Sequence, residues 1–300
     1  MATITAPWQV DFAGVLLGPG TPYVISEITG LGTPEMRTQD VDVPGDDGAF
    51  PGADYYRPRT VVLEVGIKTP GDAAAAADAL AALQRAADAP SIRKDAGDRS
   101  VMRVLWPGRD GVRRLYGRVR QVEVASMSKA VYGWVPVRLE FAATDPMWHS
   151  EPEQTLTLSL NLAYEQGLGF KFPVRFPVTT GVVDPEARPG WMSNDGDAPA
   201  WPKVSITGPC VNPVIRHVQS GRELRLNLSI QSGQLLQMET RPGTRWAVLD
   251  GANASASLTR TSRLDLFRIP PGRSEIVWTA SSYSNSTRLT VAWRDTYSAL

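Results

Sequence analysis

The chain has 300 residues, 42% of them hydrophobic and 21% charged, which is the composition of a folded globular protein and excludes an intrinsically disordered one. Domains commonly contain about 100–200 residues, so this length predicts two of them. Basic and acidic side chains balance at 31 each, giving a net charge of zero, whereas a dedicated nucleic-acid binder carries a basic excess. We therefore expect no sequence-specific nucleic-acid partner.

Targeting signals and reactive cysteines are scarce. The N-terminus lacks the basic segment and apolar run of a secretory signal, and no apolar run approaches the roughly 20 residues that span a bilayer. We therefore expect that the protein is synthesised in the cytoplasm and does not associate with a membrane. The only cysteine, Cys210, has no internal disulfide partner, and a half-buried structural thiol is favoured over a nucleophile.

The first half of the chain predicts a sheet with one packed helix. Residues 61–67 (VVLEVGI) are rich in β-branched side chains and predict a strand. Asp72 is the predicted N-cap of an Ala-rich helix that Pro90 stops. The helix carries an apolar stripe at i, i+3 and i+4 spacing that is expected to face the sheet. The stripe consists of Ala76, Leu80, Leu83 and Ala87.

Three further strands follow the helix, at residues 101–106, 114–124 and 131–141, and a hairpin turn at 107–111 joins the first two. The pattern breaks near residues 145–148. We place the domain boundary there, with an N-terminal domain at 1–150 and a C-terminal domain at 151–300.

The C-terminal domain predicts a β-sandwich. Residues 164–202 are irregular and rich in proline, which favours a binding loop or assembly contact and, equally, a segment that wraps its own domain. Beyond them, short strands alternate with Pro/Gly turns. Period-2 alternation places one set of side chains in a core and the other in solvent. The expected core set is Leu224, Leu226, Leu228, Ile230, Leu289, Val291 and Trp293, and the expected solvent set is Arg225, Asn227 and Ser229.

The sequence contains few residue patterns typical of catalytic or metal-binding sites. His149 and His217 lie in different predicted domains, neither has a zinc-like ligand spacing, and we expect ordinary surface or half-buried side chains. No nucleophile elbow or phosphate-binding loop is present, and a glycan hydrolase would need two carboxylates flanking a cleft. The acidic turn at 40–48 lacks the ligand spacing of a calcium loop, so a solvated turn is favoured. We expect no catalytic residues, metal or cofactor.

The order of several turn-and-strand motifs resembles the distal tail protein (Dit) family of siphophages, the siphovirus-type tail components. Each motif is weak alone, and their order and spacing carry the resemblance over nearly the whole chain. The motifs are VPGDDG (43–48), YYRPRTV (55–61), ATDPMW (143–148), NDGDAP (194–199), PKVSITG (202–208), IPPGRS (269–274) and VAWRD (291–295).

The resemblance implies a mainly β protein with an N-terminal β-sandwich belt domain, one packed helix, and a C-terminal galectin-like β-sandwich. It implies a homohexameric ring in the virion, at the distal tip of the tail, that connects the tube to tip or host-recognition proteins and leaves a channel for DNA. The implied partners are further copies of the chain, the tail tube protein, a tail-associated or tip-fibre protein, and the tape measure protein.

A carbohydrate-binding tail module that contacts cell-wall polysaccharide is the alternative function. The galactoside-binding patterns of galectins are missing, because His217 is followed by Val218 and Gln219, and Trp246 by Ala247. A lectin-like fold is therefore expected without its sugar site. Trp191 remains the candidate for stacking on a carbohydrate.

Residues just before the predicted strand 61–67 are candidates for the ring interface. Tyr55, Tyr56, Arg57 and Arg59 belong to residue types that are enriched in interfaces, although a solvated turn before a strand explains them equally well. The strand 61–67 and the hairpin at 108–111 are candidates as well, because unpaired strand edges invite a neighbour.

Overall fold

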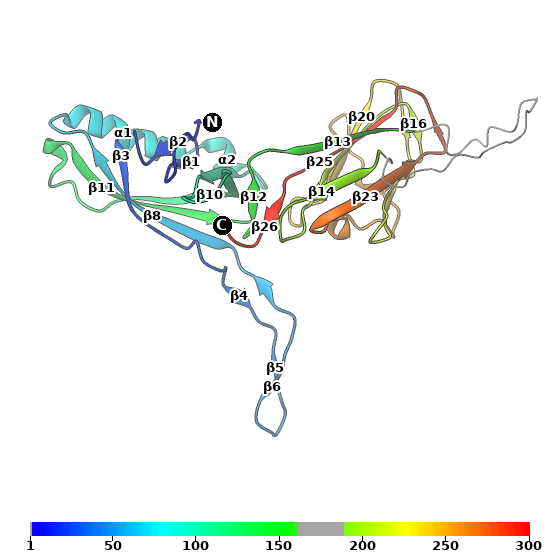
Figure 1. The fold of residues 1–300 in the computed structure, drawn as a ribbon, viewed down its shortest axis with the longest axis horizontal. Helices are drawn as coiled ribbons and strands as arrows, with labels where there is room; N and C mark the ends of the chain where they lie inside the picture. The colour runs from blue at the N-terminus through cyan, green and yellow to red at the C-terminus, as the bar shows by residue number, and fades with distance from the viewer. Residues whose placement is uncertain (1, 161–188) are drawn as a thin grey trace, which may run out of the picture. The chain divides into compact units, whose positions relative to one another are not determined.

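The computed structural model describes residues 2–160 and 189–300, and it is mainly β (Figure 1). It separates into two compact units. Unit 1 comprises residues 1–151 together with the last five residues, 296–300, and unit 2 comprises residues 152–295. The last five residues lie in unit 1, whereas the sequence-based boundaries place them in the C-terminal domain. Unit 2 is thus an insertion between two segments of unit 1.

Unit 1 is built on a nine-stranded sheet in the order β2-β1-β9-β10-β11-β8-β3, to which β12 and β26 are added beside β10. All its pairs are antiparallel. Its strands are β1 (Val10–Phe12), β2 (Val15–Leu17), β3 (Tyr23–Thr29), β8 (Arg59–Lys68), β9 (Ser100–Val104), β10 (Arg113–Val124), β11 (Trp134–Ala143), β12 (Trp148–Ser150) and β26 (Thr296–Tyr297).

The core of unit 1 lies between the two halves of this sheet. Along β8, Val61, Leu63, Val65 and Ile67 are buried, because alternate residues of a strand share one face. Side chains of β1 and β9 meet those of β3 and β8 around a small internal cavity. This arrangement gives the predicted sandwich-like domain.

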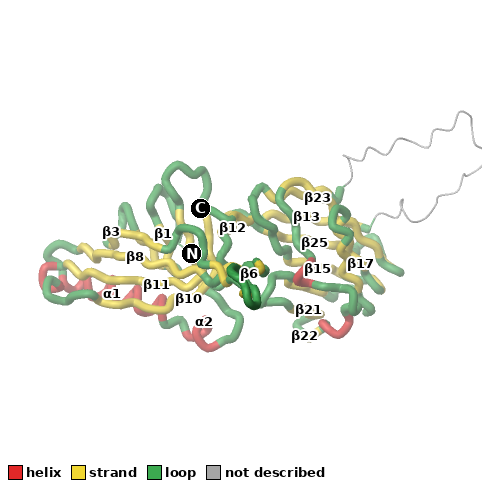
Figure 2. Tube along the Cα trace, turned by 90° about the horizontal axis from the view of Figure 1, so that it is seen from below, coloured by secondary structure: helices red, strands yellow, loops and turns green. Residues whose placement is uncertain are grey.

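Helix α1 (Ala73–Ala87) begins where the sequence predicts, because Oδ1 of Asp72 accepts a hydrogen bond of 2.9 Å from the backbone N–H of Ala75. Ala76 and Leu83 are buried against the sheet. A second helix, α2 (Pro90–Lys94), follows on the same side of the strands (Figure 2).

The predicted start of the strand at residue 131 is wrong. Residues Ala130–Tyr132 form a 3₁₀ turn, η1, and the strand β11 begins only at Trp134. Gly133 links the two with a positive φ of 76°, a conformation that favours glycine. Val131 and Tyr132 are left exposed rather than half-buried in a strand.

Residues 33–58 leave the sheet of unit 1 as a long two-stranded ribbon, which we call the arm (Figure 1). Its strands are β4 (Met36–Arg37), β5 (Val41–Asp42), β6 (Ala49–Phe50) and β7 (Tyr55–Tyr56). β4 pairs with β7 and β5 pairs with β6, both antiparallel. The tip is the turn between Val43 and Gly48, whose backbone N–H and C=O groups hydrogen-bond at 3.0 Å.

Unit 2 is a two-layer β-sandwich. A six-stranded sheet in the order β13-β25-β15-β20-β21-β22 faces a four-stranded sheet in the order β14-β23-β17-β18, and a small sheet β19-β16-β24 completes the unit. The strands are β13 (Gln154–Ser159), β14 (Trp191–Asn194), β15 (Lys203–Thr207), β16 (Cys210–Val211), β17 (Val214–His217), β18 (Arg222–Arg225), β19 (Ser229–Ile230), β20 (Leu235–Glu239), β21 (Trp246–Leu249), β22 (Ala252–Asn253), β23 (Gly272–Thr279), β24 (Ser282–Tyr283) and β25 (Arg288–Trp293), with two 3₁₀ turns, η3 (Ser255–Ser257) and η4 (Leu264–Leu266).

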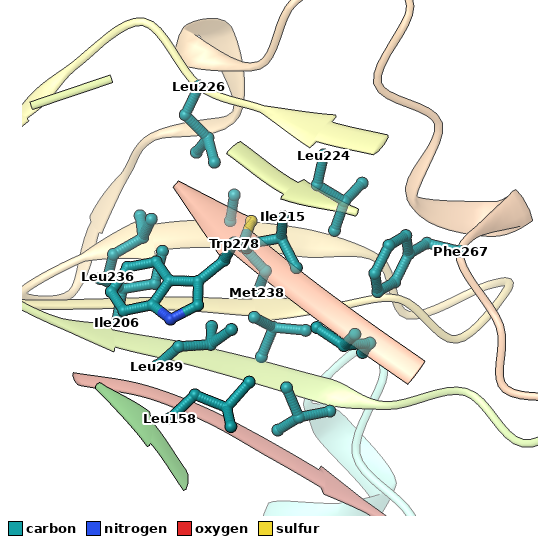
Figure 3. Packing of buried hydrophobic residues seen from close by; sticks show 14 of the residues in the cluster. Leu158, Ile206, Ile215, Leu224, Leu226, Leu236, Met238, Phe267, Trp278 and Leu289 are labelled. Atoms are coloured by element: carbon teal, nitrogen blue, oxygen red, sulfur yellow. The ribbon is translucent and has the colours of Figure 1, made fainter. Parts of the chain in front are cut away.

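The core of unit 2 is filled from both sheets (Figure 3). Ile206 and Leu289 come from the six-stranded sheet, and Ile215, Leu224 and Trp278 come from the four-stranded one. The predicted alternation is confirmed, since Leu224, Leu226, Ile230, Leu289, Val291 and Trp293 are buried, Leu228 is half-buried, and Arg225, Asn227 and Ser229 are exposed. The fold class predicted from sequence is confirmed.

Candidate functional site

Both histidines are fully buried, which corrects the expectation of surface or half-buried side chains. His149 is enclosed within unit 1, where Nε2 lies 3.0 Å from Oδ2 of Asp145 and Nδ1 lies 3.3 Å from Oγ1 of Thr296. His217 hydrogen-bonds Ser220 through Nδ1 at 2.8 Å, and burial lowers its pKa. A buried imidazole held by neighbours of its own unit is typical of a structural residue.

The remaining candidates for chemistry are also structural in their contacts. Cys210 is buried in the core of unit 2, and burial raises the pKa of its thiol to about 11. The thiolate needed for nucleophilic attack is therefore disfavoured. Within the described part of the chain, no three His, Cys, Asp or Glu side chains are grouped so that they hold a metal ion.

The acidic turn lies along the arm. Oδ1 of Asp40 accepts from the backbone N–H of Gly52 at 2.9 Å, and Oδ1 of Asp46 accepts from that of Asp47 at 2.8 Å. These local bonds stabilise the ribbon and its turn, which agrees with the interpretation of a solvated acidic loop.

Trp191 lies on β14 and is half-buried. The guanidinium carbon of Arg273 is 4.2 Å from the centroid of its ring, so a cation covers one face of the indole. Stacking of a carbohydrate on Trp191 stays a prediction. Most of the irregular segment predicted at 164–202 lies outside the described residues.

Three of the four ring-interface candidates are exposed at the root of the arm. Tyr55 and Tyr56 form β7 and are 51% and 41% exposed. Arg37 lies over the ring of Tyr55, with its guanidinium carbon 5.5 Å from the centroid. Arg57 pairs with Glu35 across the root at 3.6 Å. The structure therefore brings these three residues together on one projecting element.

Arg59 differs from the other three candidates because it is only 3% exposed. It is the first residue of β8, and the alternation of that strand turns its side chain inward. Nη1 donates a hydrogen bond of 2.8 Å to the carbonyl oxygen of Leu31, and Nε donates one of 3.1 Å to that of Pro146. Arg59 thus fixes the root of the arm to the body of unit 1 and is not available as a surface contact.

The strand expected to offer an unpaired edge is interior to the sheet. β8 pairs with β11 on one side and with β3 on the other, which corrects the expectation for residues 61–67. The edges of the main sheet are β2 and β3. In the hairpin at 108–111, the side chain of Arg109 donates a hydrogen bond of 2.7 Å to the backbone carbonyl of Leu300.

Sequence reasoning missed the apolar side chains of the arm. Met36 lies directly opposite Tyr56, and Val41 directly opposite Phe50. Met36, Val41 and Phe50 are 46%, 64% and 61% exposed. A signal was present in the sequence, because Val41 and Phe50 stand symmetrically on either side of the VPGDDG turn, as in a hairpin.

Comparison with known protein families finds a match for most of the second unit. Residues 195–297 match the model of the siphovirus-type tail component, C-terminal domain. The C-terminal unit is similar to this tail component domain. This similarity agrees with the resemblance found in the sequence motifs, and the likeness to the SPP1 Dit structure described next confirms that resemblance. No curated protein sequence matches the chain.

Solved structures extend the likeness to nearly the whole chain. The Dit protein of phage SPP1, described as a paradigm of the hub adsorption apparatus in phages infecting Gram-positive bacteria, has a TM-score of 0.59 at 12% identity, over 96% of this chain and 98% of that one. A chain of the phage p2 baseplate in its activated conformation with Ca has a TM-score of 0.52 at 10% identity, over 95% and 97%. A chain of the same baseplate with Sr has a TM-score of 0.52 at 9% identity, over 95% of this chain and 96% of that one. These likenesses establish the fold of both units.

Proposed function

We propose that this tail component forms a hexameric ring at the distal end of the tail tube and leaves an axial channel for DNA. The observation that carries the proposal is the likeness in fold to the SPP1 hub protein along nearly the entire length of both chains. A fold alone does not fix a function. The match of residues 195–297 to a tail component domain supports the same conclusion independently.

The role is structural rather than enzymatic. In the described residues, His149, His217 and Cys210 are buried and bonded or packed within their own units. Exposed apolar side chains gather instead on the arm, and exposed apolar surface marks interaction sites. These features support a protein whose work is assembly.

The partners of the ring follow from its proposed position at the distal end of the tail. The ring joins the tail tube protein to a tail-associated or tip-fibre protein, and the tape measure protein is a further candidate partner. The structural neighbours are a hub protein and a baseplate chain, which supports a location at the distal tip of the virion tail.

Light scattering coupled to size exclusion, followed by electron microscopy of the same fractions, tests the ring. We expect a species of about six times the 32.6 kDa chain mass and a ring with an axial opening. Addition of the tail tube protein is included, because a partner that binds only the ring stabilises it by mass action. A monomer at every concentration, with and without the tube protein, contradicts the proposal.

A further inference from the structure

The apolar pairs of the arm have no partner surface within their own ribbon. Met36 opposite Tyr56 and Val41 opposite Phe50 are each about half exposed or more. An isolated two-stranded ribbon is marginally stable in water, and a covering surface is needed to hold it. The arm therefore presents a surface that a second surface is expected to cover.

A groove in unit 1 has matching chemistry. It has a volume of about 340 Å³ and lies between the end of α1, the helix α2 and the strand β10. Its apolar lining comes from Ala86, Ala87, Ala89, Ile92, Val119 and Val122, all of which are half-buried. These side chains offer contacts for the apolar pairs of a ribbon.

Charge is complementary between the arm and this groove. The arm carries six carboxylates against two guanidinium groups, a net charge of −4. The groove is lined by three arginines, Arg93, Arg118 and Arg120, against one carboxylate, Asp88. Asp88 is already paired with Arg93 at 2.9 Å.

The two other arginines of the groove keep their charges uncompensated. Arg118 donates only to backbone carbonyl oxygens, among them those of Asp98 at 2.9 Å and Asp95 at 2.6 Å. Arg120 is exposed, and within the described residues neither Arg118 nor Arg120 has a carboxylate in ion-pair distance. An acidic ribbon supplies the missing counter-charges.

A second groove in unit 1 is unsuitable for the arm. It has a volume of about 350 Å³ on the face of the sheet at Val24 and Trp134, and its charged lining is Glu64, Glu123 and Arg138. Two carboxylates against one guanidinium give this groove a negative charge like that of the arm. Like charges brought together disfavour the contact.

We propose that the arm of one copy of this chain packs into the α2–β10 groove of the next copy. The inference rests on the proposed ring and names the contact that builds it. The arm and the groove are different surfaces of one chain, so the contact is heterologous. Repeated heterologous contacts form a ring when the rotation closes and a filament when it does not.

Thiol cross-linking tests which surfaces meet. Ala49 on β6 and Gln121 on β10 are exposed, and each is changed to cysteine, Ala49→Cys and Gln121→Cys, in one chain. A short bismaleimide is then expected to give covalent dimers and larger species on a denaturing gel. The native Cys210 contributes little background because it is 2% exposed.

Matched controls separate the arm contact from ring formation. Each single variant is expected to give no ladder, and so is Ala49→Cys combined with Ser26→Cys, which places the second thiol in the acidic groove. In protein that does assemble, cross-linking can be found only through residue 26, only within one chain, or not at all. Any of these results overturns the arm contact without contradicting the proposed ring. A monomer by light scattering overturns both.

Charge reversal gives an independent readout. Arg120→Glu is expected to weaken self-association about tenfold in sedimentation velocity, because an attraction becomes a repulsion in the groove. Adding Asp42→Arg on the arm is expected to restore most of that loss. Arg138→Glu, in the acidic groove, is the control and is expected to leave association unchanged. Equal effects of Arg120→Glu and Arg138→Glu contradict the proposal.

Discussion

Nη1 of Arg59 lies 2.8 Å from the carbonyl oxygen of Leu31, so the first residue of β8 holds the segment where the arm departs from the sheet. The guanidinium carbon also lies 5.5 Å from the ring centroid of Trp148, which is fully buried. The direction of an exposed ribbon is therefore set by a buried cation. Only a planar guanidinium supplies several donors in this fixed geometry.

Replacement of Arg59 by lysine is expected to lower the free energy of unfolding by about 2–3 kcal/mol, since the ammonium cannot serve carbonyl groups in several directions. Chemical denaturation measures the loss, and limited proteolysis is expected to show faster cleavage between residues 33 and 58. Arg57→Lys is the matched control. Its ion pair with Glu35 is 53% and 71% exposed on the two sides, and a change within about 0.5 kcal/mol is expected. Equal losses in the two variants would show that Arg59 does not anchor the arm.

Gly52→Ala is expected to distort the arm and weaken self-association while leaving the core of unit 1 intact. A Cβ at residue 52 would lie 2.0 Å from the carbonyl oxygen of Gln39 on the opposite side of the ribbon. Gly32→Ala is the control, because a Cβ there meets no atom within 4 Å. Sedimentation velocity measures association and thermal unfolding measures stability. Unchanged association in Gly52→Ala would mean that the form of the ribbon does not matter to assembly.

Glu151 joins two buried arginines and is expected to give unit 1 a dependence on acid. Its carboxylate accepts from Arg103 at 3.1 Å and from Arg114 at 2.8 Å. Burial acts to raise the pKa of Glu151, but the hydrogen bonds and charges of Arg114 and Arg103 outweigh it and hold the pKa below its usual value. This stabilisation is present above the unfolded pKa, near 4.3, and is lost as the pH falls through the lower folded pKa.

Glu151→Gln is accordingly expected to cost about 2 kcal/mol at pH 7 and to reduce the loss of stability on acidification. Denaturant titrations at pH 7 and at pH 3 measure both effects. Glu153→Gln serves as the control, because Glu153 is 53% exposed and lies 3.9 Å from Arg294. A wild type whose stability falls no more steeply than that of Glu151→Gln would rule out this role.

Cys210 is expected to be inert in the folded protein. Its thiol is 2% exposed and its pKa is raised to about 11 by burial, so both access and ionisation oppose reaction. An aromatic disulfide reagent at pH 8 should release its chromophore only after denaturant is added. Rapid stoichiometric reaction without denaturant would show that unit 2 opens readily around β16.

Local patterns in the sequence predict the regular elements well. The alternation around Leu224 and Leu226 is confirmed. Successive side chains of a strand point to opposite faces, and here one face is buried and the other is exposed to solvent. The helix is confirmed from its N-cap at Asp72 because capping depends only on neighbouring residues. Both features are local, so neighbouring residues suffice to specify them.

Features that depend on distant segments are poorly predicted. Arg59 looks like a surface residue in a Tyr/Arg-rich turn, yet its partners, Leu31 and Pro146, are 28 and 87 residues away. The burial of His149 depends on Thr296 at the opposite end of the sequence. The arm itself requires knowledge that β4 and β7 pair with each other and join no larger sheet.

The return of the chain to unit 1 has a consequence for synthesis. β26 pairs with β12 across an insertion of more than a hundred residues, and Tyr297 lies under Arg113, whose guanidinium carbon is 3.6 Å from the ring centroid. Domains generally fold in order as they leave the ribosome. Here the sheet of unit 1 cannot be completed until unit 2 has been translated in full. A truncated message therefore yields an incomplete unit 1, and every copy that can complete this sheet already contains the whole of unit 2.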